Sequence, residues 1–214
     1  MQKRCVNDFT VFEEVWHAIS HGFGLLLSTF GFGVLITLAT MSGSVAKVLT
    51  SIVFGVGLLV MYGSSTLYHA IPQYKPKSFL QILDHAAIYF LIASTYTPIT
   101  ILGVQGTFGW ILFGIVWGLA ALGIFLKFFF PGRFEVFSLL LYAIMGWLIV
   151  VAIHPFVLHV GWLPMIFLFV GGVVYSVGIF FYSKSSITLN HALWHLFVLG
   201  GTIFHYFAVF LIVK

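Results

Sequence analysis

Two long stretches without a charged side chain constrain this chain more than any other feature. Residues 85–126 and 136–183 contain no Asp, Glu, Lys or Arg. A helix rises about 1.5 Å per residue, so roughly 20 apolar residues cross the hydrocarbon core of a bilayer. Each stretch is therefore long enough for two crossings. Only 7% of the residues are charged and 61% are hydrophobic, whereas a soluble domain has about 25% charged residues. The sequence predicts an integral membrane protein.

Turn and charged residues divide the chain into seven predicted transmembrane helices. A turn at residues 103–106 splits the first uncharged stretch, and breaks at 154–155 and 159–161 split the second. The predicted fold class is all-α, a seven-helix bundle that forms one domain over residues 1–214. The expected helices cover about 17–41, 48–71, 82–102, 107–126, 136–153, 161–182 and 189–213.

The basic residues predict the orientation of the bundle. An odd number of helices places the two termini on opposite sides of the membrane. The N-terminal side then carries most of the basic residues, namely Lys3, Arg4, Lys75, Lys77, Lys127, Arg133 and Lys184. The opposite side carries Lys47 and Lys214. Because Lys and Arg concentrate in cytoplasmic connections, we expect a cytoplasmic N-terminus and an external C-terminus. This pattern explains the net charge of +4 better than nucleic-acid binding does.

Ionisable side chains gather at one predicted depth. Such residues are costly inside a membrane and usually serve a function. Six of the nine histidines lie near helix ends on the predicted cytoplasmic side: His17, His21, His69, His85, His191 and His195. All five acidic residues lie on the same side: Asp8, Glu13, Glu14, Asp84 and Glu135. The remaining histidines are His154, His159 and His205, and we expect His205, deep in the last helix, to bond a neighbouring helix.

The histidine spacing predicts a metal site. His191 and His195 are four residues apart, so they share a helix face and can hold one ion. The same spacing at His17 and His21 shows that the pattern also fits polar residues at a helix interface. His69 is the third candidate ligand. Three His ligands with one open position are typical of catalytic zinc sites. We therefore expect Zn²⁺ on His69, His191 and His195, although imidazole also suits other transition metals.

Two further residues are candidate catalytic groups. Asp84 is the carboxylate nearest to these histidines in the predicted topology. It is either a general base for a water activated by zinc or a helix N-terminal residue favoured by the helix dipole. Ser65 lies one turn before His69. It is either a hydrogen-bond donor beside the metal or a hydroxyl bonded to its own helix backbone. For Glu14 and His21 we favour a structural role, because buried polar groups need partners.

Together these residues resemble a known family. The motifs in chain order are Glu14-x-x-His17-x-x-x-His21, Ser65-x-x-x-His69, Leu83-Asp84-His85, Thr95-Tyr96-Thr97-Pro98 and His191-x-x-x-His195. They are similar to those of the hemolysin III family, the bacterial branch of the progestin and adiponectin receptor (PAQR) superfamily. One departure is visible, since the first motif usually reads Glu-x-x-Asn-x-x-x-His and His17 stands at the Asn position.

The resemblance has implications for structure and location. It implies a seven-helix protein of the bacterial plasma membrane, with a cytoplasmic N-terminus. It also implies that His69, His191 and His195 bind zinc, and that Ser65 and Asp84 belong to the zinc site.

The resemblance also implies a relation to membrane-embedded amide hydrolases that act on lipids. The expected function is zinc-dependent hydrolysis of a lipid amide or ester, with membrane lipids as partners and no nucleic acid. One alternative is a receptor-like regulator of membrane lipid homeostasis with structural zinc. Another is a pore-forming haemolysin, which the uninterrupted apolar helices disfavour. The sequence leaves the oligomeric state open.

Overall fold

The computed structural model describes residues 9–184, 187 and 189–214, and its elements in that part of the chain are helical. Seven helices are long and apolar enough to cross a membrane, as the sequence predicts. Two of these spans, Tyr74–Val104 and Glu135–Val160, each join more than one element. In chain order the elements are α1 (Val11–Met41), α2 (Val45–Ala70), α3 (Tyr74–Pro98), η1 (Ile99–Val104), α4 (Gly106–Phe129), α5 (Glu135–Trp147), η2 (Leu148–Ala152), α6 (Ile153–Val160), α7 (Trp162–Tyr182) and α8 (Asn190–Val213).

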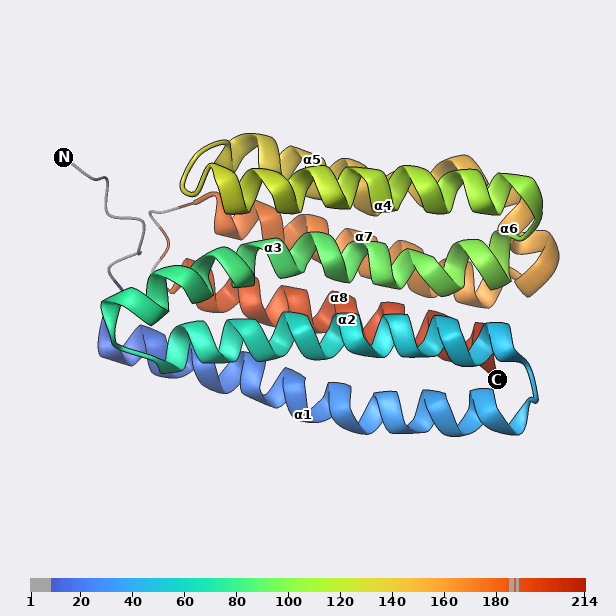
Figure 1. The fold of residues 1–214 in the computed structure, drawn as a ribbon, viewed down its shortest axis with the longest axis horizontal. Helices are drawn as coiled ribbons and strands as arrows, with labels where there is room; N and C mark the ends of the chain where they lie inside the picture. Colours follow the sequence, from blue (N-terminus) through green and yellow to red (C-terminus); the bar gives the residue numbers. More distant parts are fainter. Residues whose placement is uncertain (1–8, 185–186, 188) are drawn as a thin grey trace.

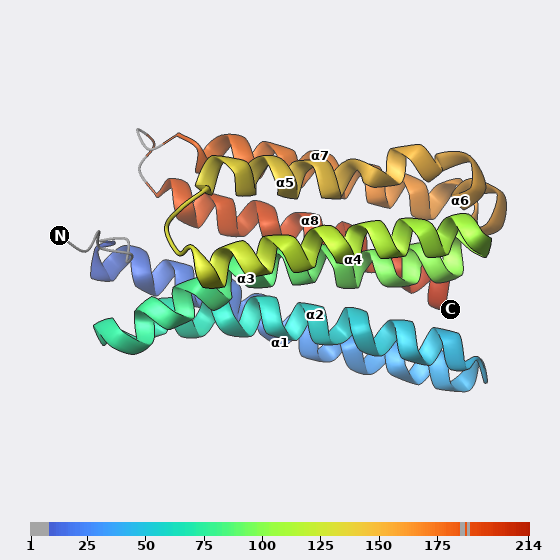
Figure 2. The same cartoon turned by 45° about the horizontal axis from the view of Figure 1, so that its top comes forward.

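The spans run along one common direction, so the bundle is elongated (Figure 1). The start of α1 and the C-terminus lie at opposite ends, as an odd number of crossings requires. Helix α1 packs against α2 and α8, α7 packs against α8, and α3 packs against α2 and α4, an arrangement that Figure 2 shows from a second direction. At the end that holds the C-terminus, Lys47 Nζ donates to the Lys214 carbonyl at 3.1 Å. We call the other end, where α1 begins, the N-terminal end.

Two helices begin earlier than expected at the N-terminal end. Helix α1 begins at Val11 rather than near residue 17, because Thr10 and Glu13 form a capping box. The Glu13 backbone N–H donates to Thr10 Oγ1 at 3.2 Å, and the Thr10 N–H donates to the Glu13 carboxylate at 2.8 Å. This arrangement satisfies two otherwise unpaired N–H groups. Helix α3 likewise begins at Tyr74 rather than near residue 82. These added turns place Glu14 and Lys77 inside the bundle.

One of the three expected breaks is absent from the structure, the one at 154–155. Pro155 lies in the first turn of α6, where a helix needs no N–H from that residue, so the helix continues. The turn comes at Gly161, whose φ of +82° suits glycine. Helix α3 continues past Pro98 into the π-helical η1, and the chain turns at Gln105 and Gly106, within the turn expected at 103–106.

Small residues let aromatic rings approach the helix axes closely. Helix α1 buries one stripe at spacings of three and four residues: His17, His21, Gly24, Ser28, Gly31, Leu35 and Ala39. The Tyr206 hydroxyl donates to the Gly31 carbonyl at 3.0 Å. On α4 a Cβ at Gly123 would lie 2.3 Å from the Tyr89 ring, whereas one at Gly118 would meet nothing within 4 Å. Small residues of this kind bring membrane helices together.

We expect Gly123→Ala to lower the melting temperature of the detergent-purified protein, because the new methyl group would displace the Tyr89 ring between α3 and α4. Overpacking of this kind costs about 1–3 kcal/mol. The matched control is Gly118→Ala on the same helix, which should leave the melting temperature unchanged or slightly higher, since Ala is the better helix former. Equal melting temperatures for both variants would contradict the packing at Gly123.

Candidate metal centre

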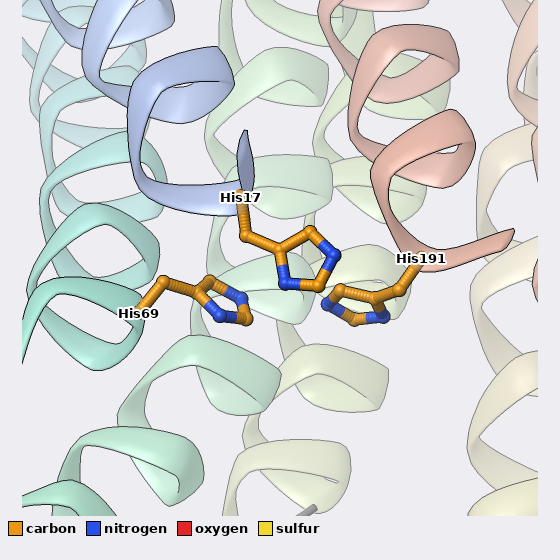
Figure 3. Close-up of side chains that lie close together, drawn as sticks. All are labelled: His17, His69 and His191. Carbon is orange, nitrogen blue, oxygen red and sulfur yellow. The ribbon is translucent and has the colours of Figure 1, made fainter. Parts of the chain in front are cut away.

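Three imidazoles from three helices meet near the N-terminal end of the bundle. They belong to His17 of α1, His69 of α2 and His191 of α8, and one ligand atom from each lies within 4.8 Å of the others. Figure 3 shows the three side chains turned toward one another. All three residues are buried. The bundle therefore brings residues that are far apart in the sequence into one cluster, which we call the histidine cluster.

Two more imidazoles adjoin the histidine cluster. The His195 ring centroid lies 4.7 Å from that of His191 and 5.0 Å from that of His69. On its other side the His195 ring stacks on His21, with centroids 3.6 Å apart. The ligand set expected from the sequence, His69, His191 and His195, thus lies together. The group with the closest ligand atoms, however, contains His17 in place of His195. The sequence marks His17 as a departure from the family motif that could add a metal ligand.

A carboxylate fixes the orientation of His69. Glu14 Oε2 lies 2.7 Å from His69 Nδ1, so the carboxylate accepts the Nδ1 proton and leaves Nε2 with a free lone pair. Glu14 Oε1 lies 2.8 Å from Lys77 Nζ, and that ammonium also donates to the Tyr68 carbonyl at 2.9 Å. Glu14 therefore links α1 to α2 and α3, in keeping with the structural role that we favoured for it.

The imidazole nitrogens carry a second signal of a ligand. Both ring nitrogens of His17 and the Nε2 atoms of His21, His69 and His191 are buried without a hydrogen-bond partner in the described part of the chain. Leaving one buried polar group unpaired costs about 1–3 kcal/mol, and native proteins rarely leave several unpaired together. A cation that accepts nitrogen lone pairs would account for the cluster. Because imidazole is a preferred ligand of zinc and of other transition metals, these residues fit the expected Zn²⁺.

The two candidate catalytic residues lie beside the cluster. Ser65 is fully buried, and its Oγ is 2.7 Å from His21 Nδ1. Asp84 is also buried, and it lines the same small cavity as Ser65, His191 and His195. We call this space the polar cavity. The fold thus brings Ser65, Asp84 and two of the three expected metal ligands to one cavity wall.

A larger apolar cavity adjoins the polar cavity. It lies between α3, α5, α7 and α8, and the space along its walls, including space open to the outside, is about 850 Å³. The two cavities share the wall residues Met61, Ile88, Tyr142 and Trp194. His205 also lines the apolar cavity. Its Nε2 lies 3.2 Å from the Leu168 carbonyl of α7, which confirms the expected bond to a neighbouring helix.

Comparison with known proteins decides the family. The family model described as "Haemolysin-III related" matches residues 9–206. The chain belongs to the hemolysin III family. It is 45% identical to the Hemolysin-3 homolog of Bacillus subtilis over 94% of both chains. It is 44% identical to Hemolysin-3 of Bacillus cereus over 92% of this chain and 90% of that protein.

A more distant relative supports the wider placement. The human monocyte to macrophage differentiation factor is 28% identical over 94% of this chain and 84% of its own length, in agreement with the PAQR superfamily. No solved structure matches the chain significantly. Membership of the family and the seven apolar helices make this a multi-pass membrane protein, and in bacteria the membrane is the plasma membrane.

Proposed function

We propose that this hemolysin III protein is a zinc-dependent hydrolase that cleaves an amide or ester bond of a membrane lipid. One observation carries the proposal. The polar cavity, which holds Asp84 and borders the histidine cluster, shares its wall with the apolar cavity. A molecule with an acyl chain and a polar head matches this pair of cavities, and lipids of the surrounding bilayer supply such molecules.

Each group has a part in the proposed reaction. When bound, zinc supplies a Lewis acid that polarises a carbonyl and activates water. His69, His191 and His195 hold the ion, and Glu14 keeps His69 in the tautomer that presents Nε2. The apolar cavity takes the acyl chain, which leaves the carbonyl at the polar cavity. Ser65, hydrogen-bonded to His21, shapes the wall beside it.

Asp84 carries the proton in this proposal. Water adds to the carbonyl carbon and its proton passes to the Asp84 carboxylate. The C–N or C–O bond then breaks, and the same proton moves to the leaving amine or alcohol. The products are a fatty acid and the remaining lipid head. A positioned base of this kind contributes about 10²–10⁴-fold to the rate.

Asp84→Asn tests this role. We expect the wild type, loaded with zinc and mixed with a panel of N-acyl and O-acyl lipids, to release free fatty acid that mass spectrometry detects. The variant should keep its zinc and lose about 100-fold or more of the rate, because the amide cannot accept the proton. Glu13→Gln is the control, since this partly exposed carboxylate lies outside both cavities. A zinc-loaded wild type that releases no fatty acid from any lipid of the panel would contradict the hydrolase proposal.

A second candidate function has one observation in its favour. The three closest imidazoles come from α1, α2 and α8, so an ion held there also ties three helices together. This arrangement suits a regulator of membrane lipid state with structural zinc. Wild-type protein that needs zinc to fold but shows no turnover would favour this function. The lytic alternative rests on the name of Hemolysin-3 of Bacillus cereus, and dye release from liposomes that contain the protein tests it.

A further inference from the structure

We infer that His17 is a metal ligand and supplies the fourth imidazole beside His69, His191 and His195. This inference rests on the metal site of the proposed function, but not on its hydrolytic step. The set expected from the sequence has three histidines, and His17 stands where the family motif usually has Asn. The geometry around His17 is the reason to add it.

The four rings form a nearly regular tetrahedron. The ring centroid of His17 lies 4.6 Å from that of His69, 4.7 Å from that of His191 and 5.2 Å from that of His195. The other three distances within the group are 5.3, 5.0 and 4.7 Å. Zinc–nitrogen bonds of 2.0–2.1 Å in a tetrahedral site place four imidazole centroids about 5 Å apart. The ring centroids thus have the spacing of a four-imidazole zinc site. The ligand atoms of His17, His69 and His191 lie within 4.8 Å of one another, and the His195 ring must turn toward them to complete the set.

The environment of His17 offers no other role for its ring. Neither ring nitrogen has a hydrogen-bond partner in the described part of the chain, and the residue is 0% exposed. Two of the neighbouring imidazoles differ, since each has one nitrogen engaged: His69 Nδ1 lies 2.7 Å from Glu14, and His195 Nδ1 lies 3.1 Å from Ser20. Phe9 covers His17, edge to face, with centroids 4.8 Å apart. A fully buried imidazole without partners is costly, and an ion that takes its lone pair removes that cost.

The position of His17 has a consequence for the ion. His191 and His195 line the polar cavity, whereas His17 and His69 do not. His17 therefore approaches the ion from the side away from the cavity. Four protein ligands fill the tetrahedral positions of zinc, so water or a carbonyl reaches the ion only as a fifth ligand, whereas three protein ligands leave a position open. We expect this chain to hold zinc more tightly than a variant with the family's Asn, in which one position becomes open.

The first test compares metal binding in purified wild type, His17→Asn and His154→Asn, without any activity assay. His154 is an exposed histidine outside the cluster, so its variant is the matched control. Competition with a zinc chelator should show wild-type affinity for His154→Asn and an affinity about tenfold or more lower for His17→Asn. The visible absorption of the cobalt-substituted protein should also change in His17→Asn alone, because a nitrogen ligand is lost.

The second test needs no variant and so does not depend on one that folds. X-ray absorption spectroscopy of the zinc-loaded wild type counts the imidazoles on the ion. Four imidazoles would support the inference, and three or fewer would overturn it. Unchanged affinity and cobalt spectrum in a folded His17→Asn protein would also overturn it, while the zinc-dependent hydrolase would stand. A wild type that binds neither zinc nor cobalt would overturn both the assignment of His17 as a ligand and the proposed hydrolase. A zinc-loaded but inert wild type would overturn the proposed hydrolase alone.

Discussion

Replacing His191 with alanine is expected to strip zinc from the purified protein and to abolish its stabilisation by added zinc. His191 belongs both to the histidine cluster and to the wall of the polar cavity. Ligands that bind only the folded state stabilise it by about 4 kcal/mol when present at 1,000 times their dissociation constant. We therefore expect excess zinc to raise the melting temperature of the wild type by several degrees and to leave that of His191→Ala unchanged. Elemental analysis of both proteins gives the zinc content directly.

The control for this prediction is His159→Ala. His159 is exposed and its Nδ1 lies 2.7 Å from the Pro155 carbonyl of its own helix, at the end of the bundle away from the cluster. This variant should keep about one zinc per chain and the full thermal response. If His191→Ala kept wild-type zinc and the wild-type thermal shift, the cluster would not be the metal site.

The number of membrane spans follows from local properties of the sequence. Apolar length and charge position are set residue by residue, so the two uncharged stretches predict four spans without any knowledge of packing. Helix ends depend on finer contacts. The capping box of Thr10 and Glu13 extends α1, and the first-turn position of Pro155 lets α6 continue. The first of these patterns is readable in the sequence, whereas the second depends on where the preceding helix ends.

The composition of the histidine cluster depends on how each helix is rotated about its axis. Topology alone places His69, His191 and Asp84 at one depth of the membrane. In the structure His69 and His191 belong to the histidine cluster, and Asp84 and His191 line the polar cavity. Topology does not say whether His17 faces the cluster or a neighbour. The signal that could have found it is the stripe of α1, in which His17 and His21 share a face with Gly24, since small residues mark the face that packs.

Lys77 was missed for a different reason. The sequence predicts that Lys77 lies in a cytoplasmic connection, because a charged side chain usually contacts solvent. The early start of α3 instead buries its side chain, which is 8% exposed, against the carboxylate of Glu14. A buried ammonium needs a charged partner, and only the packed bundle shows that this partner comes from α1.

We expect Glu14→Ala to weaken zinc binding and to destabilise the fold together. The variant would remove the carboxylate that fixes the His69 tautomer, and loss of such a partner lowers metal affinity about 10–100-fold. It would also leave Lys77 buried without its anion, and breaking a buried ion pair costs about 3–5 kcal/mol. Chelator competition measures the first effect, and thermal unfolding of the zinc-free protein measures the second.

Two neighbouring variants separate these effects. Glu14→Gln keeps an acceptor for His69 Nδ1 but removes the charge beside Lys77, so it should retain more zinc affinity than Glu14→Ala while the zinc-free fold stays weakened. Glu13→Ala removes the adjacent, partly exposed carboxylate, whose hydrogen bonds are with Thr10 at the α1 cap. It should therefore leave zinc affinity unchanged. Equal zinc affinity in Glu13→Ala and Glu14→Ala would mean that Glu14 does not position His69. A zinc-free Glu14→Ala protein as stable as the wild type would mean that Lys77 finds another partner.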